Sequence, residues 1–221
     1  MAQSLQTPFA IATGLGLASS SYFFLGNLGL VTCGVIRFTT SPSLRADLNI
    51  PPDSAVSLWA AMYEHGAAQF APASLLSALA LYTASVQVLG TSGSGSGGGG
   101  ATTTHRLLGT HAHTQLVSRL FLSASLLSLT ILPYTLLVMM PNIKPLIATR
   151  DRIRAARKRS GSGSGSGSGS DAPNAPLTSV LNAQEGEQAL DRIGVWKVQN
   201  LGRMAIGATV WALAAVATFL A

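Results

Sequence analysis

Charged residues are scarce in this chain of 221 residues: 10% are Asp, Glu, Lys or Arg, whereas 48% are hydrophobic. Soluble domains usually carry about 25% charged residues, so the composition argues against an ordinary soluble protein. The net charge of +6 would suit a nucleic-acid-binding protein, but such a protein does not leave long stretches without one charge. The composition therefore predicts a membrane protein that binds no nucleic acid.

Cysteine is almost absent as well. Cys33 is alone, which excludes an intramolecular disulfide framework and any zinc site with several cysteine ligands. Its apolar surroundings predict a small hydrophobic residue rather than a reactive thiol. The chain contains no Walker, dinucleotide, G-x-S-x-G or H-E-x-x-H motif. We therefore expect no nucleotide or flavin cofactor.

Three histidines form the pattern H-x5-H-x-H at His105, His111 and His113. Metal sites usually add a carboxylate or a cysteine to such histidines. The segment from Gly90 to Arg119 holds neither an acid nor a thiol. We therefore expect no bound metal.

Four uncharged apolar stretches are long enough to cross a bilayer, which takes a helix of about 20 residues. They lie at 8–36, 66–89, 120–140 and 204–221. The first is a retained span rather than a signal peptide, because its first basic residue, Arg37, follows the apolar run instead of preceding it. Pro133 lies inside the third stretch and predicts a kink. The expected fold is all-α, a four-transmembrane-helix bundle forming a single membrane domain over residues 1–221.

Two tracts consist almost entirely of glycine and serine: Ser92–Gly100 and Ser160–Ser170. Such tracts cannot bury enough apolar area to offset the entropy lost on ordering them. We predict flexible loops over residues 90–104 and 160–176. These loops do not separate domains, because each half of the chain alone would hold only two spans.

Basic residues are distributed unevenly among the loops, and this bias predicts the orientation in the membrane. With four spans, the first and third loops lie on the same side, and they hold twelve of the fourteen Lys and Arg residues. We predict that these loops are cytosolic and that both termini are lumenal. The run Arg150–Arg159 could be a nucleic-acid patch, but beside a membrane span it is better explained as a topology determinant that touches anionic headgroups.

Small residues are expected at the helix contacts, because lipid gives helices no hydrophobic reason to associate. Span four places four alanines on one helical face, span three offers two serines, and span one offers a glycine, an alanine and a tyrosine. These residues are Ala205, Ala208, Ala212 and Ala215; Ser125 and Ser128; and Gly14, Ala18 and Tyr22.

Polar and aromatic residues gather near three ends of the predicted spans. They are LWAAMYEHG at 58–66, MMPNIK at 139–144 and WKVQNLGR at 196–203. By the predicted orientation, all three lie at the cytosolic boundary. Spans two and four are expected to begin there, so two helix N-termini would add partial positive charge.

The WKVQNLGR segment places Trp196, Asn200 and Arg203 within about 60° of one another on a helix. An amide in such a stripe needs polar partners. A purely structural alternative remains, in which the arginine reaches the lipid headgroups and the tryptophan belongs to a belt of aromatic residues at the membrane interface. Glu64 could form a structural ion pair with Arg203 or with Lys197.

The candidate residues of the LWAAMYEHG segment do not all lie on one helical face. Trp59 and Tyr63 share one helical face, and Met62 projects between Trp59 and His65. His65 lies about 200° from Tyr63 on an ideal helix. The three can reach one pocket only if the helix is irregular near Gly66.

These motifs resemble the anthrone oxygenase family of small membrane proteins. The resemblance rests on W-x3-Y-x2-G from Trp59, on PYTLLVMMPNIKPL at the end of span three, and on W-x3-N-x2-R from Trp196. It covers most of the chain apart from the Gly/Ser tracts. The family usually shows Thr-Asn after the proline that closes span three, whereas this chain reads Pro141-Asn142-Ile143, which leaves Asn142 as a shifted equivalent.

The resemblance implies a cofactor-independent monooxygenase that oxidises an anthrone to an anthraquinone with O₂ in polyketide secondary metabolism, in the endoplasmic reticulum. Its partners would be a hydrophobic aromatic polyketide and the lipid bilayer, and a homo-oligomer is compatible with it. His65 would act as base, because an unperturbed imidazole titrates near neutrality. The implied donors to an oxyanion are Asn200, Arg203 and Tyr63, and the implied substrate-binding residues are Trp59, Met62, Trp196 and Asn142.

Two other classes of function fit the sequence less well. A non-catalytic four-helix membrane scaffold or assembly protein would use the same residues for packing and anchoring. A transporter or channel usually places ionisable groups near the middle of the membrane, and the four predicted cores lack them.

Overall fold

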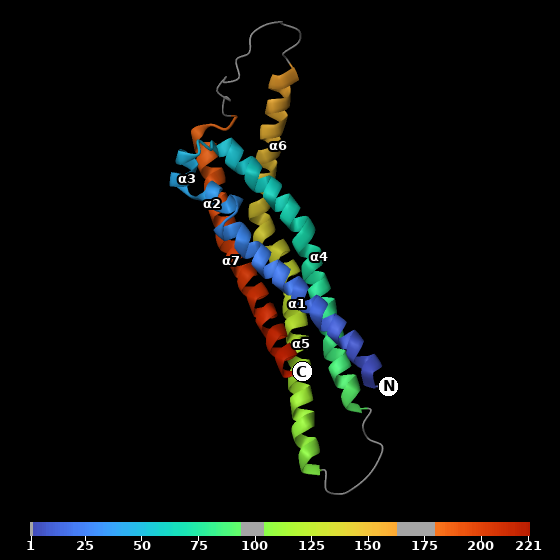
Figure 1. Ribbon diagram of the computed structural model, residues 1–221. Coiled ribbons are helices and arrows are strands. Elements are labelled where there is room, and N and C mark those ends of the chain that lie inside the picture. The colour runs from blue at the N-terminus through green and yellow to red at the C-terminus, as the bar shows by residue number, and fades with distance from the viewer. Residues whose placement is uncertain (1, 94–103, 163–179) are drawn as a thin grey trace. The chain divides into compact units, whose positions relative to one another are not determined.

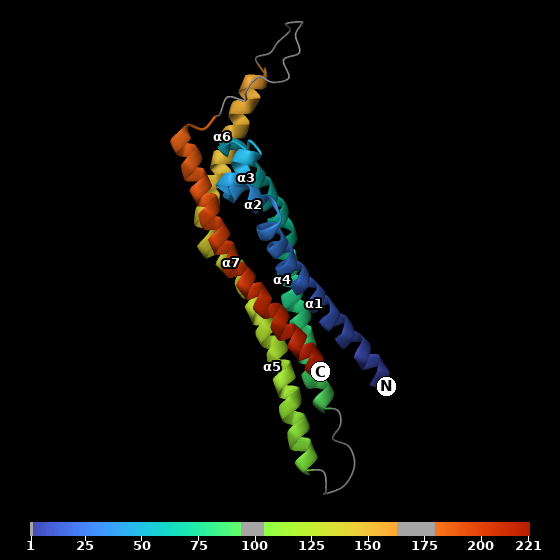
Figure 2. The ribbon, with the colours of Figure 1, turned by 60° about the vertical axis from the view of Figure 1, so that its left-hand side comes forward.

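The computed structural model describes residues 2–93, 104–162 and 180–221, and every regular element in these ranges is helical (Figures 1 and 2). The elements are α1 (Ala2–Thr32), α2 (Val35–Thr40), α3 (Pro42–Asp47), α4 (Pro52–Gly93), α5 (Thr104–Tyr134), the π-helix η1 (Thr135–Met139), α6 (Met140–Ser162) and α7 (Ala183–Leu220). The predicted all-α class is confirmed.

Four helical stretches are long and apolar enough to cross a membrane. They are Thr7–Thr40, Pro52–Gly90, His111–Arg159 and Ala183–Leu220. Each contains one of the four predicted spans in whole or nearly so. The structure thus fits an integral, multi-pass membrane protein.

The helices run well beyond the apolar stretches. α4 begins at Pro52 rather than near Gly66, and α7 begins at Ala183 rather than near Met204. The prediction of two helix N-termini beside the polar segments was therefore wrong. Hydrophobicity marks where a helix can enter lipid, whereas the helix itself continues as long as its residues favour helix, as the Ala-, Glu- and Gln-rich start of α7 does.

The predicted loops are also shorter than expected. The first holds α2 and α3, and the third is helical through the whole basic run Arg150–Arg159 in α6. Of the two Gly/Ser loops, Gly90–Gly93, Thr104 and Ser160–Ser162 are helical, and the remaining positions in 94–103 and 163–176 lie outside the described residues. Arginine, lysine and alanine are good helix formers, so charge alone does not end α6.

Pro133 is followed at once by a change of helix type. α5 ends at Tyr134 and the π-helix η1 takes up the next five residues, Thr135–Met139. A proline has no N–H to donate to the preceding turn, so the hydrogen-bond ladder must be rearranged there. The Thr135 hydroxyl donates to the Ile131 carbonyl at 2.8 Å. A π-helix thus follows the position of the kink that the sequence predicts.

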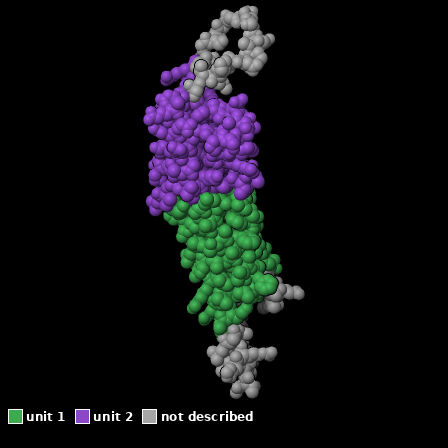
Figure 3. Space-filling view, turned by 90° about the vertical axis from the view of Figure 1, so that its left-hand side faces the viewer, with its two compact units in different colours: residues 1–28, 68–135, 201–221 green, residues 29–67, 136–200 purple. Residues whose placement is uncertain are grey.

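The chain divides into two compact units (Figure 3). Unit 1 comprises Met1–Leu28, Ala68–Thr135 and Leu201–Ala221, and unit 2 comprises Gly29–Ala67 and Leu136–Asn200. Parts of α1, α4 and α7 belong to each unit, so each is built from segments far apart in the sequence.

Serine hydroxyls join α4 to α5 in unit 1. Ser125 donates to the Ala78 carbonyl at 2.8 Å, and Ser128 donates to the Ser74 carbonyl at 2.9 Å. These bonds confirm the predicted packing role of both serines. Further along the same helix pair, two more buried serines, Ser85 and Ser118, each donate to the carbonyl of the other, at 3.0 and 3.1 Å.

The predicted helix contacts of spans one and four were wrong for Gly14, Ala18, Ala205 and Ala212, which are exposed. Ala208 and Ala215 are half-buried, and Tyr22 does contact α4, because its hydroxyl donates to Gln69 Oε1 at 2.7 Å and its ring centroid lies 5.8 Å from that of Phe70. The buried residues are instead Gly16 on α1 and Gly207, Val210, Ala214 and Ala217 on α7. A β-carbon at Gly16 would lie 2.6 Å from Leu81 Cδ2, and one at Gly207 would lie 2.8 Å from Phe23 Cδ1. Bulky partners on neighbouring helices, not alanine spacing, decide which face packs. Cys33 is exposed.

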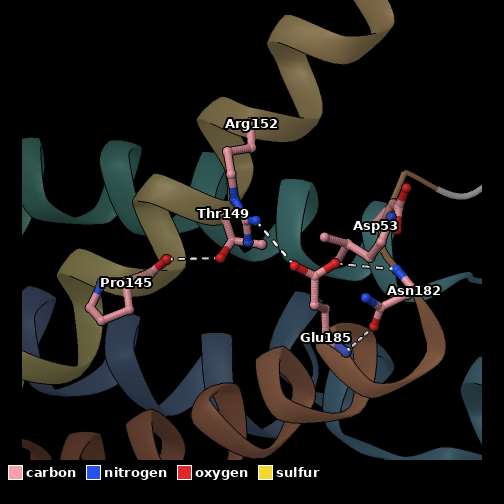
Figure 4. A network of polar contacts seen from close by, with 7 residues as sticks. Asp53, Pro145, Thr149, Arg152, Asn182 and Glu185 are labelled. Atoms are coloured by element: carbon pink, nitrogen blue, oxygen red, sulfur yellow. Dashed lines mark hydrogen bonds and ion pairs between the residues drawn. The ribbon is translucent and has the colours of Figure 1, made fainter.

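In unit 2, a network of polar contacts joins the first turn of α4 to the residues that precede α7 (Figure 4). The buried Asp53 carboxylate accepts hydrogen bonds from the Val180 and Leu181 backbone N–H groups at 2.7 and 3.4 Å. Asn182 caps α7, because its Oδ1 accepts from the Glu185 N–H at 2.8 Å while the Glu185 carboxylate accepts from the Asn182 N–H at 3.3 Å. The start of α7 is thereby fixed to the start of α4.

Candidate functional site

Two tryptophans form the centre of unit 2. Trp59 on α4 and Trp196 on α7 are 0% and 2% exposed, and their rings meet edge to face with centroids 5.8 Å apart. Tyr63, one turn after Trp59, stacks on its ring at 5.5 Å with an interplanar angle of 9°. The Tyr63 hydroxyl lies 4.0 Å from Met140 Sδ. The structure thus brings together three of the predicted aromatic residues from two helices.

Asn200 is the most unusual residue of this unit. Its side chain is fully buried, yet neither its Nδ2 nor its Oδ1 has a hydrogen-bond partner among the described residues. The indole N–H groups of Trp59 and Trp196 are likewise buried and without a partner in the described part of the chain. A buried, unsatisfied polar group costs about 1–3 kcal/mol, so each one calls for a partner such as a ligand, a water or an ion. Unit 2 therefore holds three polar groups suited to a polar ligand.

Neighbouring polar contacts hold α7 against η1 and α6. Gln199 Nε2 donates to the Val138 carbonyl at 2.9 Å, and Asn142 Nδ2 donates to the Arg192 carbonyl at 2.9 Å. Asn142, predicted to bind substrate, thus has its amide engaged by the backbone of α7. Met62 is half-buried.

His65 lies apart from the tryptophans. Its side chain is exposed, whereas Trp59 on the same helix is fully buried. α4 is an uninterrupted α-helix from Pro52 to Gly93, so the irregularity near Gly66 that would bring His65 and Tyr63 to one face does not occur. The structure thus places the predicted base and the predicted aromatic pocket on different faces of α4.

Glu64 pairs with a partner that the sequence did not indicate. Its Oε1 lies 2.7 Å from Nη2 of Arg150 on α6, and the Arg150 side chain is 6% exposed. The expected pairs of Glu64 with Arg203 or Lys197 were wrong. The sequence could not show this pair, because it depends on α6 continuing as a helix through a run that was expected to be a loop.

Arg203 is buried in unit 1, 7% exposed. Its Nη2 donates to Asn27 Oδ1 on α1 at 2.7 Å, and its Cζ lies 5.7 Å from the centre of the Phe23 ring. Asn27 was not among the predicted site residues. The available signal was that Asn27 provides the only amide side chain in the stretch 8–36.

All three residues of the W-x3-N-x2-R motif are buried on α7: Trp196, Asn200 and Arg203 are 2%, 0% and 7% exposed. This agrees with their predicted common face. Trp196 and Asn200 belong to unit 2, and Arg203 belongs to unit 1.

Within the described residues, no group of three or more His, Cys, Asp or Glu side chains is placed to hold a metal ion. His111 and His113 are exposed. A narrow seam in unit 1, lined by Ser20, Phe23, Ser128 and Gly207 among others, leaves no room for a water molecule.

The fold and the buried groups define a small integral membrane protein whose helices enclose tryptophan, amide and guanidinium side chains. The anthrone oxygenase family model matches residues 59–217, well over half of the chain. The chain therefore belongs to the anthrone oxygenase family, and an oxygenase function is supported at the level of that family. The match includes Trp59, Trp196, Asn200 and Arg203 but not Asn27. No curated protein and no solved structure matches the chain.

Proposed function

We propose that this protein is a cofactor-independent monooxygenase that converts an anthrone to an anthraquinone with O₂ in polyketide secondary metabolism. The observation that carries the proposal is the fully buried Asn200 amide, unsatisfied among the described residues, beside two buried indole N–H groups in unit 2. Such groups are suited to an aromatic ligand with polar oxygens, and they lie in the region that matches the family.

Oxidation of an anthrone by O₂ requires few catalytic groups from the protein. Loss of a proton from C10 of an anthrone gives an aromatic, electron-rich anthrolate. The C10 carbanion centre transfers its electrons to O₂ and forms a C–O bond, and protonation gives the C10 hydroperoxide. Removal of the second C10 proton breaks the O–O bond, so the products are the quinone carbonyl and one water. O₂ is the oxidant, and the protein contributes a base, donors to the oxyanion and an apolar surrounding.

The residues of unit 2 suit these roles. The rings of Trp59 and Trp196 offer flat surfaces to a tricyclic substrate, with Met62 and Asn142 nearby on α4 and α6. Asn200 and the Tyr63 hydroxyl would donate to the oxygen that gains negative charge. Because Trp59 and Trp196 already touch in edge-to-face contact, substrate entry requires these rings to separate.

Arg203, in unit 1, is a further proposed donor to an oxyanion. His65 is the proposed base, although it lies on the exposed face of α4. It would take the proton from a substrate whose edge reaches that face. His65→Ala tests this role separately. Unchanged oxygenation by that variant would assign proton removal to another acceptor and leave the role of Asn200 intact.

The central experiment replaces Asn200 by leucine, which has a similar volume and no polar atoms. Anthrone-dependent O₂ consumption by the purified protein in lipid should fall about 100-fold, because one oxyanion donor is lost. The melting temperature should stay the same or rise, because an unsatisfied buried amide is removed.

The matched control is Gln115→Leu, the same kind of change at an exposed amide of α5. It should alter neither quantity. Undiminished oxygenation by Asn200→Leu would refute the proposed site. If the wild-type protein fails to accelerate anthrone oxidation above the spontaneous rate, the protein is better described as a membrane scaffold.

We also propose residence in the endoplasmic reticulum membrane with the first and third loops cytosolic, since these hold most of the basic residues. In a Cys33→Ser background, cysteine placed at Arg157 should react with an impermeant maleimide added outside sealed microsomes. Cysteine placed at His111 should react only after the membrane is permeabilised. The reverse pattern would overturn the orientation.

A further inference from the structure

The basic run 150–159 on α6, in unit 2, divides into two parts that differ in their contacts. In the first part, Arg150 Nη2 lies 2.7 Å from Glu64 Oε1 on α4. Arg152 Nη1 lies 3.1 Å from Glu185 Oε1 on α7. These two arginines are paired with carboxylates of unit 2, so they help to hold α6 against its two neighbours.

The second part of the run has no such partners. Four basic side chains are exposed there, and within the described residues no hydrogen bond or ion pair engages them; they are Arg154, Arg157, Lys158 and Arg159. Arg154 experiences the charge of the Glu64 carboxylate, but the hydrogen bond of that carboxylate goes to Arg150. Unneutralised positive charge therefore gathers in the last turns of α6.

Arg157 continues the face of α6 that packs inside unit 2. That face is formed by four buried side chains spaced three, four and three residues apart: Ile143, Leu146, Arg150 and Ile153. The next position of the pattern is Arg157, and it is exposed. Arg154 and Lys158 lie within about 100° of Arg157 on the helix, and we call these three residues the basic face. The packed face of α6 thus becomes exposed and basic in its last turns.

These last turns of α6 extend past the beginning of α7. Arg152 meets Glu185 in the first turn of α7, and Figures 1 and 2 both show α6 continuing beyond that turn. A segment that added to unit 2 at this end would therefore meet the basic face directly.

The basic face is distant from the predicted end of the third apolar stretch at Met140. The helical stretch His111–Arg159 continues through this point, and with a rise of about 1.5 Å per residue Arg154 lies about 21 Å farther along it. Charges of lipid headgroups near Met140 are largely screened at that distance, because the Debye length at physiological ionic strength is about 8 Å. This distance argues against contact between the basic face and the headgroups of the same membrane.

Nucleic acid also fits this surface poorly. Single strands are usually bound by a basic groove together with aromatic side chains on which the bases stack. α6 contains no aromatic residue. An acidic protein segment, in contrast, needs only complementary charge, and three bases on one helical face supply it.

We propose that the basic face, Arg154, Arg157 and Lys158, is a docking surface for an acidic segment of a soluble protein. Acidic side chains along such a segment complement the three positive charges and extend the packed face of α6 beyond Ile153. The inference is independent of the proposed oxygenase function, because no residue of the tryptophan site takes part in it.

The test uses a fluorescein-labelled helical peptide that carries all its glutamates on one face. A control peptide has the same composition, with its glutamates distributed around the helix. Binding to the whole protein, in nanodiscs of neutral lipid, is measured by fluorescence anisotropy. The one-face peptide should bind at least about fivefold more tightly than the control peptide, because only the former meets all three charges at once. Equal affinities for the two peptides would overturn the inference.

The decisive variant replaces the basic face by glutamine: Arg154→Gln/Arg157→Gln/Lys158→Gln. It should weaken binding of the one-face peptide about tenfold, because three exposed ion pairs, each weak alone, are lost together. The melting temperature should not change, because these side chains have no partners within the described residues. Undiminished binding by this variant would refute the docking surface.

The matched control removes the same charge from three other exposed positions of unit 2, as Arg37→Gln/Lys144→Gln/Arg192→Gln. Affinity for the one-face peptide should change less than about twofold, because attraction from outside the basic face is screened by salt. Equal losses in the two triple variants would show that net charge alone attracts the peptide, and the inference would fall.

Two further measurements test other occupants of the basic face. Phosphatidylserine added to the nanodisc should lower the peptide affinity less than about twofold, and a greater loss would mean that the basic face lies on headgroups and would overturn the inference. A single-stranded RNA that binds more tightly than the one-face peptide and loses affinity in the basic-face variant would identify a nucleic-acid surface instead.

Discussion

Different kinds of contact stabilise the interior of each of the two units. The core of unit 1 is rich in alanine, and most of its buried polar residues are serines, five of which donate to a backbone carbonyl of a neighbouring helix. The core of unit 2 contains two tryptophans and several isoleucines, and charged groups such as Asp53 and Arg150 are buried beside it. Unit 1 relies mainly on close helix approach, together with the charged hydrogen bond from Arg203 to Asn27, and unit 2 relies on large side chains and several charged hydrogen bonds.

Contacts of the kind seen in unit 1 are typical of helices that associate within a membrane. Helices in lipid gain little from burying apolar surface, so they associate through small residues and interhelical hydrogen bonds. Charged side chains with several polar partners are tolerated where their ends can be satisfied, as in the network of Asp53, Arg152 and Glu185. The Asn200 amide and the indole N–H groups of Trp59 and Trp196 differ from this network, because they have no hydrogen-bond partner among the described residues.

The largest effect on stability is expected from Asp53 in unit 2. Asp53→Ala leaves the Val180 and Leu181 N–H groups without their acceptor and should lower the free energy of unfolding by about 3 kcal/mol, because hydrogen bonds to charged groups are strong. Thermal unfolding in detergent measures the loss. Asp47→Ala, at an exposed aspartate of α3, is the control. Equal melting temperatures for the two variants would show that the network does not hold unit 2.

A smaller loss is expected in unit 1 from filling the space at a close helix contact. Gly16→Ile places atoms where Leu81 already lies and should cost about 2 kcal/mol of unfolding free energy. Gly14→Ile is a matched control on the same helix, because nothing lies within 4 Å of its β-carbon position. If both variants are equally stable, α1 does not pack through Gly16 as described.

The smallest effect is expected from the serine pair of α4 and α5. A double-mutant cycle of Ser85→Ala and Ser118→Ala should give a coupling of about 0.6 kcal/mol, the usual value for interhelical hydrogen bonds in membranes. The exposed Ser123, replaced by alanine, should show no coupling with Ser85. A coupling energy larger than the stability loss of Asp53→Ala would reverse the contrast between the two units.

The burial of several candidate residues was predictable from their spacing, but the contacts between them were not. The W-x3-N-x2-R spacing correctly predicted that Trp196, Asn200 and Arg203 are all buried on α7. Spacing could not reveal that Asn27, distant in sequence, would accept a bond from Arg203. Nor could it establish the pairing of Glu64 with Arg150, which depends on where α6 lies against α4.

The sequence by itself determined the number of spans and the helical class, because a long uncharged apolar stretch has no other stable conformation in lipid. Tertiary structure alone decided which helix faces pack and which buried groups find partners. Alanine spacing suggested one face of α7, whereas contact with Phe23 at Gly207 selected another. The physical reason is that hydrophobicity is a property of each segment, while close packing and hydrogen bonding are properties of pairs of segments.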